Sequence, residues 1–92
     1  MYILKILVNN QLEDIADEVK YKRLSREIHW EHQINNNELI TLGTREFRVS
    51  GKTHLINNQH GAIELKLCDM RVNRLEFDHT VNELRLEGWT QQ

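Results

Sequence analysis

The sequence predicts an α+β fold: a mostly antiparallel β meander or partly closed barrel, with one N-terminal helix packed on it. Three observations support this fold class. Apolar residues recur at helical spacing between about residues 11 and 22, and at every second position in several later segments. A short phrase with turn-forming asparagines is also written twice near the C-terminus. The 92 residues contain no linker-like stretch, so 1–92 is expected to form a single globular domain.

The first predicted element is a strand over residues 2–8. Six of its seven residues are apolar, with Lys5 as the exception. A run of this kind is typical of a strand that is covered on both faces, so we expect a central position in the sheet.

The N-terminal helix is predicted for residues 11–22. Asn10 and Glu13 have the spacing of a capping box. An apolar stripe follows at helical spacing, with acidic residues near the start of the segment and basic residues near its end, as the helix dipole favours. The stripe consists of Leu12, Ile15, Ala16 and Val19.

Several strands are predicted after the helix. Apolar and polar residues alternate over 28–34, and the asparagines at 35–37 indicate a turn. Residues 39–42 would then return as the second strand of a hairpin. Gly43 is predicted to mark a bulge or kink before a strand at 45–49.

The next segments predict a turn, a short strand, a loop and another strand. We expect the turn at 50–52, the strand at 53–56 and the loop at 57–61. Residues 63–67 alternate regularly and predict a strand with one apolar face.

The repeated phrase occupies residues 72–78 and 81–87. Its apolar residues would change repeatedly from one face of a strand to the other. A flat strand does not allow this change, because its side chains alternate strictly. We interpret the phrase as two consecutive strands, with Asn73 and Asn82 each at a bulge or tight turn. Two copies are fewer than a solenoid requires.

Composition limits the function classes. The formal net charge of −2 gives no general attraction to nucleic acid. The single cysteine, Cys68, excludes an internal disulfide and a cysteine-rich zinc site. No apolar run is long enough to span a membrane and no signal peptide is evident, so the protein is expected to be cytoplasmic.

One basic cluster with aromatic neighbours is the candidate binding site. It could contact phosphates while the aromatic rings stack on bases, or it could simply be the solvated end of the predicted helix. The candidate residues are Lys20, Tyr21, Lys22, Arg23, Arg26 and Trp30.

No motif predicts catalysis, a metal or a cofactor. His29 and His32 would point to opposite faces of a strand, so they cannot form one metal site by themselves. Cys68 lies in an apolar segment and is expected to be buried. Residues 50–53 imitate the end of a phosphate-binding loop, but the required upstream glycine is missing.

The expected function is a small non-enzymatic protein-interaction or regulatory module, of the kind that mobile elements and viruses encode. Strand edges without proline favour pairing with a partner protein or self-association. The alternative is a nucleic-acid-binding domain that uses the cluster at 20–26. An acidic face for a basic partner is a weaker option than a solvated surface; its residues would be Glu13, Asp14, Asp17, Glu18, Glu27 and Glu31.

Overall fold

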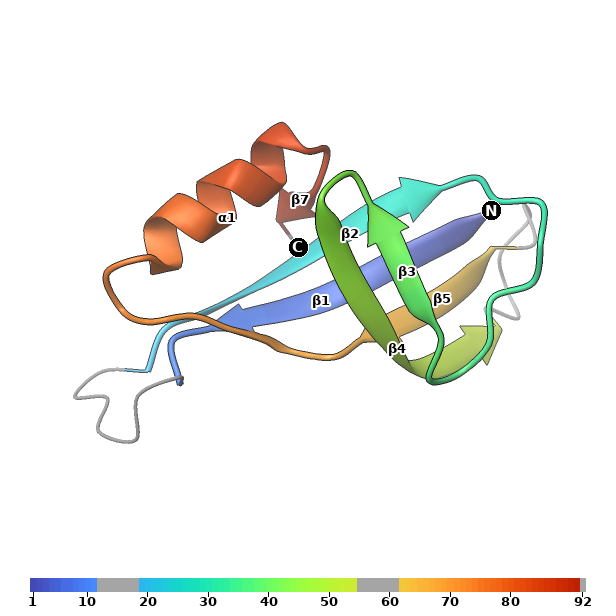
Figure 1. The fold of residues 1–92 in the computed structure, drawn as a ribbon, viewed down its shortest axis with the longest axis horizontal. Coiled ribbons are helices and arrows are strands. Elements are labelled where there is room, and N and C mark those ends of the chain that lie inside the picture. The colour runs from blue at the N-terminus through green and yellow to red at the C-terminus, as the bar shows by residue number, and fades with distance from the viewer. Residues whose placement is uncertain (12–18, 55–61, 92) are drawn as a thin grey trace. The chain divides into compact units, whose positions relative to one another are not determined.

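The computed structural model describes residues 1–11, 19–54 and 62–91, which form seven strands and one helix (Figure 1). The elements are β1 (Tyr2–Asn9), β2 (Tyr21–Ile28), β3 (Leu39–Leu42), β4 (Arg45–His54), β5 (Ile63–Leu67), β6 (Met70–Arg71), α1 (Phe77–Leu86) and β7 (Thr90–Gln91). The α+β class is confirmed. No helix in the described ranges has the length and apolar composition needed to cross a membrane.

The sheet is open and mixed. Its strand order is β3-β4-β5-β1-β2-β7, and β6 pairs with β1 off this path. β1 runs parallel to β5 and β6, whereas the β2–β7, β3–β4 and β4–β5 pairs are antiparallel. Within the described residues the end strands β3 and β7 do not close on each other, so the predicted barrel is wrong.

The chain divides into two compact units. The first unit comprises Met1–Lys5 and Glu27–Cys68, and the second comprises Ile6–Arg26 and Asp69–Gln92. Each unit has its own buried apolar residues. Those of the first unit are Tyr2, Leu4, Ile28, Ile34, Ile40, Phe47, Val49, Ala62, Leu65 and Leu67.

Strand alternation builds the first unit. Phe47 and Val49 are both buried, which confirms that they share a face, and the strand at 63–67 is also confirmed. The turn predicted at 50–52 is wrong, because β4 continues to His54 with an irregularity in its pairing between Val49 and Gly51. Gly43 has φ 62° and lies in the two-residue turn between β3 and β4, not at a bulge.

The strand predicted at 28–34 is also wrong beyond Ile28, where β2 ends. In its place, the hydroxyl of Tyr2 binds the backbone of the following loop. It accepts a hydrogen bond from Ile34 N at 3.1 Å and donates one to His32 O at 3.3 Å. The turn at 35–37 is confirmed, and Asn37 adopts the left-handed conformation there with φ 66°.

The helix of this fold is C-terminal and belongs to the second unit. Phe77, Val81 and Leu84 are buried on one side of α1, four and three residues apart. The two strands predicted for the repeated phrase are therefore wrong. The N-terminal helix is wrong where it can be compared, since Tyr21 and Lys22 open β2; residues 12–18 lie outside the described ranges.

The end of α1 is fixed by backbone geometry. Gly88 has φ 102°, and its N–H donates to Arg85 O at 3.1 Å. Trp89 N donates to Leu84 O at 3.0 Å, and both of these side chains are buried. These two hydrogen bonds, together with the buried apolar side chains of Leu84 and Trp89, form a Schellman motif. The motif ends the helix, and the chain then continues into β7.

Candidate functional site

The end strand of the first unit considered as a pairing edge is β3, which lies at one end of the strand order. Its four residues, Leu39-Ile40-Thr41-Leu42, include no charge and no proline. Ile40 is buried, whereas the Leu39 side chain is 51% exposed. Natural edge strands usually carry charges, prolines or bulges that prevent pairing with other chains, and β3 lacks the first two of these.

The outward-facing backbone groups of β3 follow from one hydrogen bond. Val49 N donates to Glu38 O at 3.0 Å, so Glu38 directs its carbonyl toward β4. Successive residues of an antiparallel strand alternate in direction, and therefore Ile40 and Leu42 also point toward β4. The N–H and C=O groups of Leu39 and Thr41 point away from it. We call these four backbone groups the β3 edge.

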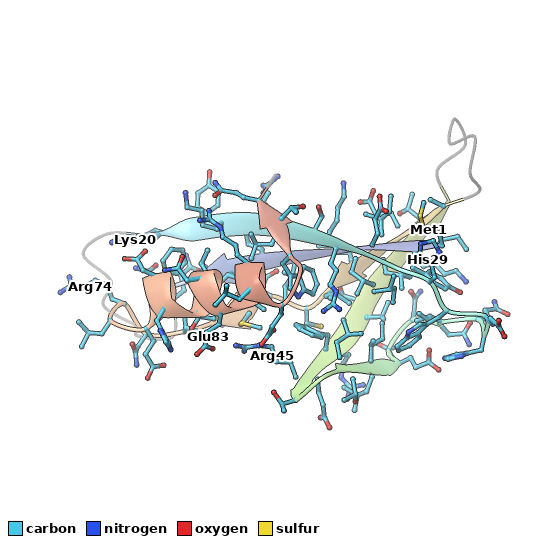
Figure 2. The ribbon with its side chains drawn as sticks, turned by 90° about the horizontal axis from the view of Figure 1, so that it is seen from above. Met1, Lys20, His29, Arg45, Arg74 and Glu83 are labelled. Carbon is cyan, nitrogen blue, oxygen red and sulfur yellow. The ribbon has the colours of Figure 1, made fainter. Side chains whose placement is uncertain are left out.

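The basic cluster does not form one patch. Lys20 precedes β2, as Figure 2 shows, and the strand then alternates. Tyr21 and Arg23 lie on one face and are exposed, with Tyr21 at 59%. Lys22 and Arg26 lie on the opposite face, which they share with the buried Leu24.

The alternative view of the cluster, as the solvated end of a helix, does not apply, because Tyr21–Ile28 is a strand. Arg26 lies beside the turn after α1: a Cβ on Gly88 would be 3.6 Å from Arg26 Nε. Among the described residues, no carboxylate forms an ion pair with Lys20, Lys22, Arg23 or Arg26.

Trp30 belongs to the first unit, whereas residues 20–26 belong to the second. Its ring lies against that of His32, with a centroid separation of 5.0 Å and an interplanar angle of 32°. Trp30 is partly buried and His32 is exposed.

The remaining polar candidates give no chemical site in the described part of the chain. No group of three metal-ligating side chains occurs there. His79 Nε2 lies 2.7 Å from Glu83 Oε1, one turn along α1. His60 and the side chain of His54 lie outside the described residues, as do Glu13, Asp14, Asp17 and Glu18; Glu27 and Glu31 are exposed.

The prediction that Cys68 is buried is wrong. Leu65 and Leu67 are buried and Lys66 between them is exposed, so the same alternation places Cys68 on the exposed side. Its N–H donates to Arg48 O at 2.8 Å, and its side chain is exposed.

The sequence predicted unguarded edges in general but did not identify β3. The available signal was the run of four uncharged residues between Glu38 and the turn at Gly43. That signal identifies β3 as an unguarded edge only once the strand order shows that β3 is an end strand.

Comparisons of the chain with protein-family models, with curated proteins and with solved structures found no match.

Proposed function

We propose that this protein is a non-enzymatic protein-interaction module that binds a partner protein by strand addition at the β3 edge. The observation that carries the proposal is the unguarded end position of β3, with the backbone groups of Leu39 and Thr41 directed away from β4. In strand addition, main-chain hydrogen bonds supply affinity and alternate side chains supply specificity.

The side chains around the β3 edge suit an extended peptide. Leu39 and Thr41 lie on the exposed face, and the register places them opposite Arg48 and Glu46 of β4. A partner strand with an apolar residue beside Leu39 would cover a side chain that is now half exposed. Arg48 and Glu46 are charged residues of β4 on this face, two strand spacings from that strand, and Glu38 directly precedes β3.

An affinity capture tests the proposal. The tagged chain is incubated with an extract of the organism that encodes it, and retained proteins are identified by mass spectrometry. We expect a protein that the wild type retains and that Leu39→Lys and Thr41→Pro lose. Lysine and proline are both characteristic of edges that do not pair, and the Thr41 N–H is not used by β4.

The matched control is Thr53→Lys, which adds the same charge to an exposed position of β4 outside the β3 edge, where β4 pairs with β5. It should retain the partner. Far-UV circular dichroism verifies that each variant is folded. If no protein depends on Leu39 and Thr41 while all variants fold, the proposal is wrong.

A second candidate function is binding of single-stranded nucleic acid, favoured by the exposed Tyr21 and Arg23 on one face of β2. An aromatic ring beside a cation can stack on a base while the cation contacts a phosphate. Fluorescence anisotropy with labelled single-stranded DNA and RNA should detect binding that Tyr21→Ala or Arg23→Glu abolishes. Absence of binding at low salt excludes this candidate.

A further inference from the structure

We infer that the β3 edge also pairs with the β3 edge of a second copy of this chain, as an antiparallel dimer with Ile40 facing its own counterpart across the two-fold axis. The inference rests on the proposed function, because it uses the same backbone groups. It names a partner of defined chemistry: the strand Leu39–Leu42 itself.

The faces of β3 restrict the register. Ile40 and Leu42 lie on the buried side and Leu39 and Thr41 on the exposed side, so paired residues must have the same parity. The outward hydrogen-bonding groups belong to Leu39 and Thr41. If Leu39 of one copy lies opposite Thr41 of the other, the two-fold axis also places Thr41 of the first copy opposite Leu39 of the second. Only this register pairs all the outward N–H and C=O groups of β3 with each other.

This register gives four hydrogen bonds between copies, two at each Leu39–Thr41 pair. Ile40 then forms the central pair without hydrogen bonds. A shift of the axis to Leu39 or Thr41 would leave one hydrogen-bonded pair within β3 and would move the other pairs to Asn37 or Gly43, which lie in turns.

Charge does not oppose the pairing. A symmetric antiparallel pair places identical strands against each other, so a charge near the axis would repel its counterpart. β3 has none. On the exposed face of the paired sheets, Arg48 and Leu39 of one copy lie in one cross-strand row with Thr41 and Glu46 of the other copy. The two ends of each such row therefore carry opposite charges.

A four-residue strand pair is small, so the dimer is expected to be weak and to exchange readily. A heterologous strand and a second copy would occupy the same groups. Self-association would therefore compete with partner binding and protect the edge when the partner is absent.

Sedimentation velocity between about 0.02 and 2 mM protein, a range suited to small interfaces, tests the inference. The weight-average sedimentation coefficient of the wild type should rise toward that of a dimer. Leu39→Lys should remain monomeric over the whole range, and Thr53→Lys should behave as the wild type does. A wild type that stays monomeric at every concentration, or a dimer that Leu39→Lys does not weaken, overturns the inference.

A cross-linking experiment tests the register. Cys68→Ser removes the native thiol, and Leu39→Cys and Thr41→Cys are introduced into separate copies of that variant. Paired Cα atoms at a hydrogen-bonded position are about 5.5 Å apart, within the range of a disulfide. Oxidation of the mixture should give mostly the mixed dimer; faster cross-linking of either variant with itself overturns the register.

The two proposals fail separately. A monomer that still captures a partner through Leu39 and Thr41 refutes only the dimer. A dimer through β3 that captures no other protein supports the self-pairing and refutes a heterologous partner.

Discussion

The N–H of Trp89 donates to the carbonyl of Leu84 at 3.0 Å, and this bond closes the end of α1 over two buried side chains. The closure requires the chain to pass through Gly88 with φ 102°. A residue with a Cβ rarely adopts this backbone conformation. The C-terminal segment therefore depends on one glycine.

Gly88→Ala should lower the free energy of unfolding by about 1–2 kcal/mol, the usual cost of a positive φ for a residue with a Cβ. The cause is the backbone, because the added Cβ would be in ordinary contact with Arg26 Nε at 3.6 Å. Urea denaturation followed by circular dichroism measures the change.

Gly51→Ala is the matched control for that experiment. Its Cβ would lie 3.8 Å from the Cβ of Lys66, and Gly51 is not among the positive-φ residues. Alanine should change stability little there, or raise it slightly. Equal losses at Gly51 and Gly88 would contradict the role assigned to the left-handed turn.

The orientation of α1 is tested by two leucines that lie two residues apart. Leu84 is fully buried and Leu86 is 89% exposed. Leu84→Ala should lower the free energy of unfolding by about 2–5 kcal/mol, and Leu86→Ala should change it by less than about 0.5 kcal/mol. A strand would place both leucines on one face and would give similar effects. Similar losses in the two variants would therefore argue against the helix.

The error at this helix has a physical cause. The apolar positions Phe77, Val81 and Leu84 are separated by four and then three residues. A spacing of three changes the face of a strand, so a strand interpretation of this segment requires a bulge. The same spacing keeps one face of a helix, so the changes of parity were the helical signal.

The opposite error occurred in β2. The sequence predicts a helix as far as residue 22, but Tyr21 and Lys22 open β2. Basic residues around Lys22 matched the expected end of a helix dipole, which favoured the wrong alternative. Pairing of Leu24 with Gln91, 67 positions later, decides the structure there, and no local pattern contains that information.

Several of the correct predictions share one property. Ile40, Phe47, Val49 and Leu65 lie in strands whose alternating burial is visible in the local sequence. The sequence also anticipated unguarded edges, since they depend on composition. It did not place the basic residues of 20–26 on opposite faces, because that outcome required the correct secondary structure.

The loop after β2 depends on Tyr2. Its hydroxyl binds the backbone at His32 and Ile34, and the bond from Ile34 N is buried. Tyr2→Phe would leave that N–H without its partner, so the free energy of unfolding should fall by about 1–3 kcal/mol. Tyr21→Phe removes the same hydroxyl from a side chain that is 59% exposed and should be nearly neutral. Urea denaturation of both variants distinguishes these outcomes, and a neutral Tyr2→Phe would show that the loop is held by other contacts.

The two asparagines of the repeated phrase provide the last test, because the sequence assigned them the same role and the structure does not. Asn73 Oδ1 accepts a hydrogen bond from Glu76 N at 2.8 Å, just before α1 begins. Asn82 is exposed within the helix.

Asn73→Ala should therefore lower the free energy of unfolding by about 1 kcal/mol, the usual net contribution of one intramolecular hydrogen bond. Asn82→Ala should raise it by a few tenths of a kcal/mol, because alanine has the higher helix propensity. Both variants replace asparagine by alanine. Opposite signs of the change in unfolding free energy would therefore arise only from the positions of the two residues. Losses of equal size would restore the bulged-strand interpretation, in which both asparagines support irregularities of a sheet.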